Sequence, residues 1–187
     1  MTQRELFLRH VAQTSSAPLA LEIVKADCAT LYDAAGKEYI DLIGGISVAN
    51  IGHRHPKVIE AIQKQLDAYL HIMVYGEFVE APQVQYAKLL TEYLPSALNA
   101  VYFTNSGAEA VEGAMKLAKQ VTNRTQIIAF NHSYHGSTQG ALSIIGDEYW
   151  RNAFRPLLPD VLHLEYNSFA SINEITAQTA CVITETV

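Results

Sequence analysis

A turn of small residues stands where a predicted strand runs into a helix, and its backbone could bind an anion. The stretch is YFTNSGAEAVEGAMKLAKQ, residues 102–120, with Ser106, Gly107 and Ala108 in the turn. The first N–H groups of a helix have no intrahelical partner, and together with the helix dipole they favour a phosphate. However, Ser106 and Glu109 also form a Ser-x-x-Glu capping box, which occurs in helices that bind nothing. An ordinary helix cap and a phosphate site both fit the turn, which is neither a Walker loop nor a Gly-x-Gly-x-x-Gly turn.

A second candidate is the loop FNHSYHGST, residues 130–138, which follows the next apolar segment. Its His132 and His135 lie three residues apart, but no cysteine or carboxylate is near them in the sequence, so we expect no metal site. Tyr134 is unusual in a loop because large aromatic rings tend to leave exposed loops for the core. The ring could stack on a flat ligand or pack against the protein, and the sequence leaves both open.

The elements expected from residue 99 onward would bring the two candidates to one edge of a sheet. The expected strands are 99–105, 125–130, 160–166 and 180–187, and the expected helices are 107–120, 147–154 and 168–176. This alternation indicates an α/β domain with a largely parallel sheet. Ligands of such sheets bind at the carboxyl ends of the strands, and both candidates directly follow strands. On the helix after the turn, Glu112 and Lys116 are expected to form an i, i+4 ion pair facing solvent.

The N-terminal part of the chain has a different pattern. A short helix is expected over residues 2–13 and a small antiparallel meander over residues 23–42, which Gly44 and Gly45 end. His55-Pro56 opens a further helix, because proline is favoured in the first helical turn. Another helix is expected over residues 83–93.

Composition excludes several classes of protein. Of the 187 residues, 49% are hydrophobic and 17% are charged, a composition too apolar for a disordered chain. The net charge of −6 argues against a nucleic-acid partner. The two cysteines, Cys28 and Cys181, are expected to be buried free thiols, which suits a reducing cytoplasm. No apolar run reaches the length of a membrane span, and the N-terminus lacks a signal peptide. We therefore expect a soluble cytoplasmic protein. Because the chain stops in an apolar strand, we also expect it to be part of a longer one.

The motifs in their order resemble a known family. YFTNSGAEAVEGAMKLAKQ followed by IIAFNHSYHGST is similar to the class III aminotransferases, which use pyridoxal 5'-phosphate (PLP). The upstream stretch LYDAAGKEYIDLIGGISVANIGHRHPKVIEAIQKQL resembles the N-terminal segment of that family, and VITETV resembles the strand before its Glu-Pro-x-Gln-Gly-Glu loop. The resemblance covers residues 21–187.

The resemblance implies the N-terminal part of a fold-type I enzyme, with a three-layer α/β/α large domain and a mostly parallel sheet. Residues 1–50 would belong to the small α+β domain and residues 51–187 to the incomplete large domain. The family implies a homodimer that moves an amino group from an amine or amino acid donor to a 2-oxo acid acceptor. By position, Ser106, Gly107 and Ala108 would hold the PLP phosphate. Tyr134 would stack on the pyridine ring, His135 would support it, and Glu185 would lie near the cofactor.

The sequence departs from the family at several points. Ser137 stands where acetylornithine and ornithine members have an arginine for a substrate carboxylate, and serine cannot make that bidentate contact. Thr186 replaces a common proline. Transamination also needs a Schiff-base lysine, and no lysine of this chain stands in a matching motif, so no catalytic residue is assigned. A non-catalytic phosphate-binding or dimerisation module stays open, as does another PLP chemistry such as that of a mutase, decarboxylase or racemase.

Overall fold

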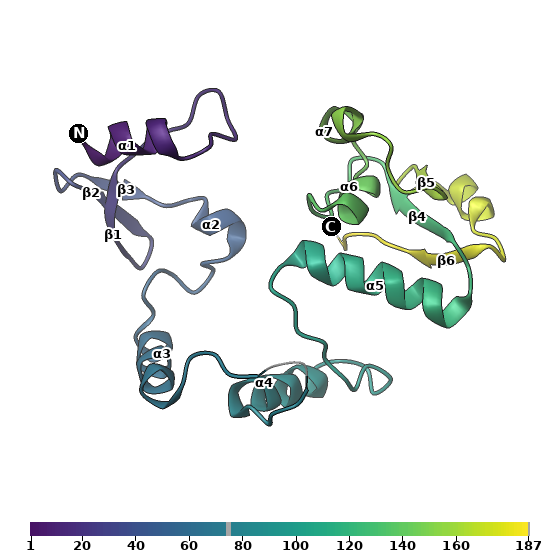
Figure 1. Cartoon of the computed structure of the whole chain (residues 1–187), viewed down its shortest axis with the longest axis horizontal. Helices are drawn as coiled ribbons and strands as arrows, with labels where there is room; N and C mark the ends of the chain where they lie inside the picture. Colours follow the sequence, from purple (N-terminus) through teal and green to yellow (C-terminus); the bar gives the residue numbers. More distant parts are fainter. Residues whose placement is uncertain (74–75, 187) are drawn as a thin grey trace. The chain divides into compact units, whose positions relative to one another are not determined.

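The computed structural model describes residues 1–73 and 76–186, and it divides the chain into two compact units. The first unit runs from Met1 to Glu80 and the second from Ala81 to Val187. Figure 1 shows the elements of each unit, which are described separately below. Within the described ranges, no helix is long and apolar enough to cross a membrane.

The first unit begins with a capped helix and a three-stranded sheet. Helix α1 spans Gln3–His10, and Thr2 and Glu5 close a capping box at its start. The strands are β1 (Ile23–Asp27), β2 (Thr30–Asp33) and β3 (Glu38–Ile40), and they pair antiparallel in the order β1-β2-β3. The predicted meander is therefore confirmed. Cys28 lies in the turn between β1 and β2 and is exposed, so its predicted burial is wrong, although it is a free thiol.

Helices α2 (Gly44–Ser47) and α3 (Pro56–Ala68) follow the sheet in the first unit, and several polar contacts join the segment between them to the sheet. Short helix α2 follows β3, which ends before the predicted Gly44-Gly45 break, and both glycines have positive φ. Helix α3 has proline in its first turn, as predicted. Asp41 accepts the backbone N–H groups of Ile43 and Gly44, and its carboxylate lies 2.6 Å from His53 Nε2. These contacts fix the chain between the sheet and α3.

The second unit contains the parallel sheet. Its elements are α4 (Ala81–Glu92), α5 (Gly107–Thr122), β4 (Gln126–Phe130), α6 (Gln139–Ser143), α7 (Glu148–Arg151), the 3-10 helix η1 (Asn152–Phe154), β5 (Val161–Leu164), the 3-10 helix η2 (Phe169–Glu174) and β6 (Thr179–Val182). Both β5 and β6 pair parallel with the central strand β4, which confirms the predicted α/β character and parallel sheet. In Figure 1, α5 runs alongside this sheet next to β6.

The core of the second unit lies between α5 and one face of the sheet. Met115 of α5 packs with Ile127 and Ala129 of β4 and with Ile144, and all four are buried. The central strand is the best covered, since Ile127, Ile128 and Ala129 have no exposed surface. Helix α5 leads directly into this strand through Asn123, which ends the helix in the left-handed conformation. This connection and the packing of Met115 together position α5 beside the sheet.

Two predictions for this unit need correction, and one helix was missed. Residues 99–104 have no regular secondary structure, because no strand in the described ranges pairs with them, and Tyr102 is 83% exposed. The predicted helix at 168–176 is the 3-10 helix η2. Helix α6 begins directly after the loop expected at residues 130–138 and was not predicted, because its five residues are too few to show a helical period.

Candidate active site

The start of α5 is capped by Ser106 as the sequence predicts, but the Glu109 carboxylate binds a different N–H group than expected. Ser106 is the N-cap, and its Oγ accepts the Glu109 N–H at 3.1 Å. The Glu109 carboxylate accepts the N–H of Asn105 at 2.8 Å, one residue before the N–H that a regular capping box would use. Gly107 and Ala108 donate no hydrogen bond to any of the described residues. Two N–H groups at the positive end of a 16-residue helix are thus left for a ligand.

The space beside this turn is open. A Cβ placed on Gly107 would have no heavy atom within 4 Å, and Ser106 and Gly107 are exposed. An anion could therefore reach the free N–H groups without displacing a side chain. Because the turn supplies no cation, binding here would depend on the N–H groups and the helix dipole.

The segment after β4, residues 131–138, lies against this helix start, and we call it the ring loop. Its Gly136 has a φ of +122°, and a Cβ there would lie only 2.6 Å from the Cβ of Ala108. The loop is turned back by Ser133, whose Oγ donates to the Phe130 carbonyl at 2.7 Å. The Ser133 carbonyl accepts the Gly146 N–H at 3.0 Å. The two segments singled out in the sequence, the helix turn and the ring loop, are therefore in direct contact.

Tyr134 is fixed through its backbone while its ring stays accessible. Its N–H donates to Oε1 of Glu185 at 2.7 Å, which links the ring loop to the chain just after β6. The side chain is 63% exposed, and its hydroxyl lies 3.3 Å from the Ser137 hydroxyl. A ring that is anchored at its backbone and open on its surface is suited to stack on a flat ligand.

His135 is buried and incompletely satisfied. Its side chain is 5% exposed, and Nε2 has no hydrogen-bond partner among the described residues. The nearest carboxylate oxygen is Oε2 of Glu185 at 3.9 Å, which is too far for a hydrogen bond. Burial lowers the pKa of His135 below its ordinary value of 6.5, and the charge of Glu185 opposes this only in part. The imidazole is therefore neutral at pH 7, with one buried nitrogen free to meet a ligand. His132, by contrast, is exposed.

The sequence prediction missed the role of Glu112. It was expected to pair with Lys116 in solvent, but its Oε1 accepts hydrogen bonds from the Thr138 hydroxyl at 2.6 Å and from the N–H groups of Gly140 and Ala141 at 2.8 and 3.3 Å. The side chain turns toward α6 because the start of that helix offers unpaired N–H donors. The spacing of Glu112 on α5 gave no signal of this contact, since it depends on where α6 lies.

Every residue assigned to the cofactor lies in this one assembly. Ala108 touches Gly136, Tyr134 bonds to Glu185, and His135 lies beside Glu185. Ser106 and Gly107 are joined to Ala108 in the chain. The assembly offers a ring for a pyridine, together with N–H groups for a phosphate and a buried nitrogen that have no partner in the described part of the chain. These features fit PLP, an anionic ligand with a flat heteroaromatic ring.

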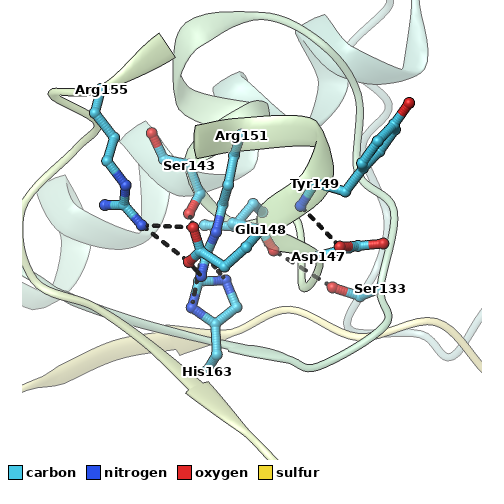
Figure 2. A network of polar contacts seen from close by, with 9 residues as sticks. Ser133, Ser143, Asp147, Glu148, Tyr149, Arg151, Arg155 and His163 are labelled. Atoms are coloured by element: carbon cyan, nitrogen blue, oxygen red, sulfur yellow. Dashed lines mark hydrogen bonds and ion pairs between the residues drawn. The ribbon is translucent and has the colours of Figure 1, made fainter. Parts of the chain in front are cut away.

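A separate polar network supports the segment between α6 and β5. Figure 2 shows Arg151 reaching between Glu148 and His163. Nη1 of Arg151 lies 2.8 Å from His163 Nε2, Nη2 bonds to Glu148, and Arg155 contacts both oxygens of Glu148. Burial and the Arg151 charge lower the pKa of His163. None of Glu148, Arg151, Arg155 and His163 belongs to the candidate site, although Figure 2 also draws Ser133 of the ring loop.

Comparison with known proteins agrees with the assembly. A family model for class III aminotransferases matches residues 11–187. An acetylornithine aminotransferase of Methanopyrus kandleri is 40% identical over 190 residues, which cover all of this chain and 48% of that protein. The chain thus spans about half the length of the curated relatives it matches.

Solved structures are similar over nearly the whole chain. The adenosylmethionine-8-amino-7-oxononanoate aminotransferase of Methanocaldococcus jannaschii has a TM-score of 0.87 at 28% identity, covering 96% of this chain and 45% of that one. The taurine:2-oxoglutarate aminotransferase of Bifidobacterium kashiwanohense, in complex with PLP and glutamate, has a TM-score of 0.84 at 26% identity, covering 99% and 47%. The sequence match and the shared fold together show that the chain belongs to the class III aminotransferases, a family that depends on PLP.

Proposed function

We propose that this chain supplies the phosphate-binding and ring-stacking part of the active site of a PLP-dependent aminotransferase. The observation that carries the proposal is the buried His135 Nε2, which lacks a partner among the described residues and belongs to the loop that contacts the start of α5. Buried polar atoms are rarely left unsatisfied unless a ligand completes them. The assembly also lies at the carboxyl ends of β4 and β6, where ligands of open α/β sheets bind.

Each residue has a distinct role in this proposal. Ser106, Gly107 and Ala108 hold the phosphate through backbone N–H groups and the serine hydroxyl. Tyr134 stacks on the pyridine ring, and neutral His135 supports the ring from the buried side. Glu185 lies near the cofactor and holds the Tyr134 backbone. When bound, PLP supplies the electron sink that lets an amino group leave its donor.

The covalent lysine of the reaction is proposed to come from outside this chain. In the second unit, the lysines are Lys88, Lys116 and Lys119. Lys116 and Lys119 lie on α5 about 13 and 18 Å along the axis from Gly107, beyond the reach of their side chains. Lys88 pairs with Glu92. The acidic partner of the pyridine nitrogen is likewise proposed to lie outside residues 1–187.

The substrates are proposed as an amine or amino acid donor and a 2-oxo acid acceptor. Glutamate accompanies PLP in the Bifidobacterium enzyme, which supports an acidic 2-oxo acid as the acceptor here. Ser137 cannot form the charged, bidentate contact that arginine makes with a carboxylate. An amino donor that places no carboxylate beside Ser137 therefore fits better. We also propose a homodimer, a three-layer large domain from residue 51 and a small-domain segment over residues 1–50.

A non-catalytic phosphate-binding module is the second candidate. It is favoured because Lys116 and Lys119, the lysines on the helix that begins at the site, do not reach the start of that helix. A different PLP chemistry, such as that of a mutase, decarboxylase or racemase, would use the same cofactor contacts.

One experiment separates these functions. The protein is expressed from its whole reading frame, mixed with PLP, and examined by visible absorption and by amino transfer from a panel of amines and amino acids to 2-oxoglutarate. Glutamate formation together with a new PLP absorption band supports the aminotransferase. PLP binding without any amino transfer would favour a module or another PLP chemistry, and no PLP binding at all would refute the proposed site.

A further inference from the structure

We propose that Glu112 is a positioning residue that fixes the ring loop onto the phosphate-binding helix. The inference rests on the proposed function, because it assigns Glu112 to holding Tyr134 and His135 in register with the α5 N-terminus. Glu112 does not touch the assigned cofactor residues itself. It acts through the segment that follows them.

The contacts of Glu112 converge on a single oxygen. Oε1 accepts from the Thr138 hydroxyl at 2.6 Å, from the Gly140 N–H at 2.8 Å and from the Ala141 N–H at 3.3 Å. These donors are the last residue of the ring loop and the first turn of α6. The carboxylate replaces the missing side-chain cap of α6, since Thr138 makes no capping bond itself. Hydrogen bonds to an ionised carboxylate are stronger than those between neutral groups.

The loop is therefore held on α5 at two points one helical turn apart. Ala108 meets Gly136, and Glu112, four residues later on the same face of the helix, meets Thr138 and Gly140. Gly140 makes this approach possible, because a Cβ there would lie 2.7 Å from the Glu112 carboxyl carbon. A third contact, between Glu185 and the Tyr134 N–H, fixes the other end of the loop. Movement at Glu112 would thus displace the ring loop relative to the free N–H groups of Gly107 and Ala108.

No basic group competes for this carboxylate. Among the described residues Glu112 forms no ion pair, although Lys116 follows it by one helical turn. Its partners are only hydrogen-bond donors of the segment it holds. Since the side chain is half-buried, the loss of this acceptor would leave the N–H groups of Gly140 and Ala141 unsatisfied.

The test compares Glu112→Ala and Glu112→Gln with a matched control, Glu92→Gln. Glu92→Gln makes the same chemical change at an exposed position, where Glu92 pairs with Lys88. For each variant of the whole protein, affinity is measured for PLP and, separately, for inorganic phosphate. Melting temperature and amide hydrogen exchange are recorded without ligand.

Glu112→Ala should weaken PLP binding about tenfold while the affinity for inorganic phosphate changes less than about twofold. Phosphate needs only the α5 N-terminus, whereas PLP also needs the ring loop in place. Glu112→Gln keeps an oxygen acceptor and should recover part of the loss, and Glu92→Gln should behave as wild type. Equal losses for PLP and phosphate, or an unchanged PLP affinity in Glu112→Ala, would overturn the proposal. If Glu112→Ala does not fold, Glu112→Gln carries the same comparison.

Hydrogen exchange separates this inference from the proposed function. In ligand-free Glu112→Ala, amides of residues 134–141 should exchange about tenfold faster, while those of β4 stay protected. If wild type binds no PLP, the proposed function fails, and the exchange result alone decides whether Glu112 holds the loop. Unchanged exchange over residues 134–141 would contradict the positioning role.

Discussion

Tyr134 shows how one residue can be both fixed and available. Its N–H is bonded to Glu185, and its ring is 63% exposed. Tyr134→Ala should therefore leave the fold intact and weaken the binding of PLP, because the stacking of the ring is lost. The expected loss of binding free energy is about 0.5–1.5 kcal/mol, which corresponds to roughly two- to twelvefold in affinity. Tyr134→Phe keeps the ring and loses only the contact to Ser137, so it is the matched control. A titration that finds Tyr134→Ala equal to wild type would remove Tyr134 from the site.

Two glycines of the site should respond in opposite ways to the same substitution. Gly107→Ala places a methyl group in open space within a helix and should leave stability unchanged or raise it by up to about 1 kcal/mol. In Gly136→Ala, the new Cβ would lie 2.6 Å from the Cβ of Ala108, and the backbone has a φ of +122°. This variant should lower the free energy of unfolding by about 1–3 kcal/mol. Urea unfolding of the two variants measures the difference. If both were equally tolerated, the ring loop would not lie against α5.

Residue identity alone could not separate the two histidines of the ring loop. His132 and His135 have the same type and nearly the same place in the sequence, yet one is exposed and the other buried. The difference arises from the turn that Ser133 and Gly146 make, which brings His135 inward. The sequence predicts the location of the site, but the buried nitrogen and the contacts of Glu185 and Glu112 depend on tertiary placement.

At the scale of elements, the sequence predicted the helices and strands that have a local signal, such as a helix cap or an apolar run. The start of α5 has a serine cap, and β4 contains a short, continuous apolar run at 127–130, so both were predictable from sequence. Residues 99–104 have a strand-like composition, but a strand also needs a neighbour for its hydrogen bonds, and the described chain provides none. Helix α6 was missed because its five residues depend on Glu112 for a cap.

The short helix α7 should depend on Arg151 far more than on Glu148. The Arg151 side chain contacts His163 (Figure 2) and the Ser143 carbonyl. It is 12% exposed, whereas the Glu148 side chain is 54% exposed. Arg151→Met should lower the free energy of unfolding by about 1–3 kcal/mol, because buried hydrogen-bond acceptors lose their donor. Glu148→Gln should change the melting temperature little, since an exposed ion pair contributes little to stability. Calorimetry of both variants checks the order, and a larger effect of Glu148→Gln would contradict it.

At the scale of the whole molecule, the histidines with shifted pKa values and the aspartates with shifted pKa values lie in different units. His135 and His163 belong to the second unit, and burial lowers the pKa of each below 6.5. Asp33 and Asp41 belong to the first unit, and hydrogen bonds lower the pKa of each below 3.8. The unfolded chain takes up protons before the folded one in each case, but in different pH ranges.

This division predicts that mild acid weakens the second unit first. The neutral histidines stabilise it fully above pH 6.5, and this contribution is lost as the pH falls from 6.5 toward their lower folded pKa values. The aspartates stabilise the first unit above pH 3.8 and lose that effect only below it. Hydrogen exchange at pH 7.0 and about 5.5, corrected for intrinsic rates, should show protection falling in β4 and β5 but not in β1–β3. His163→Asn, which keeps an acceptor for Arg151 without titrating, should reduce the loss in β4 and β5. Equal losses in both sheets, or an unchanged response in that variant, would show that these histidines do not control acid stability.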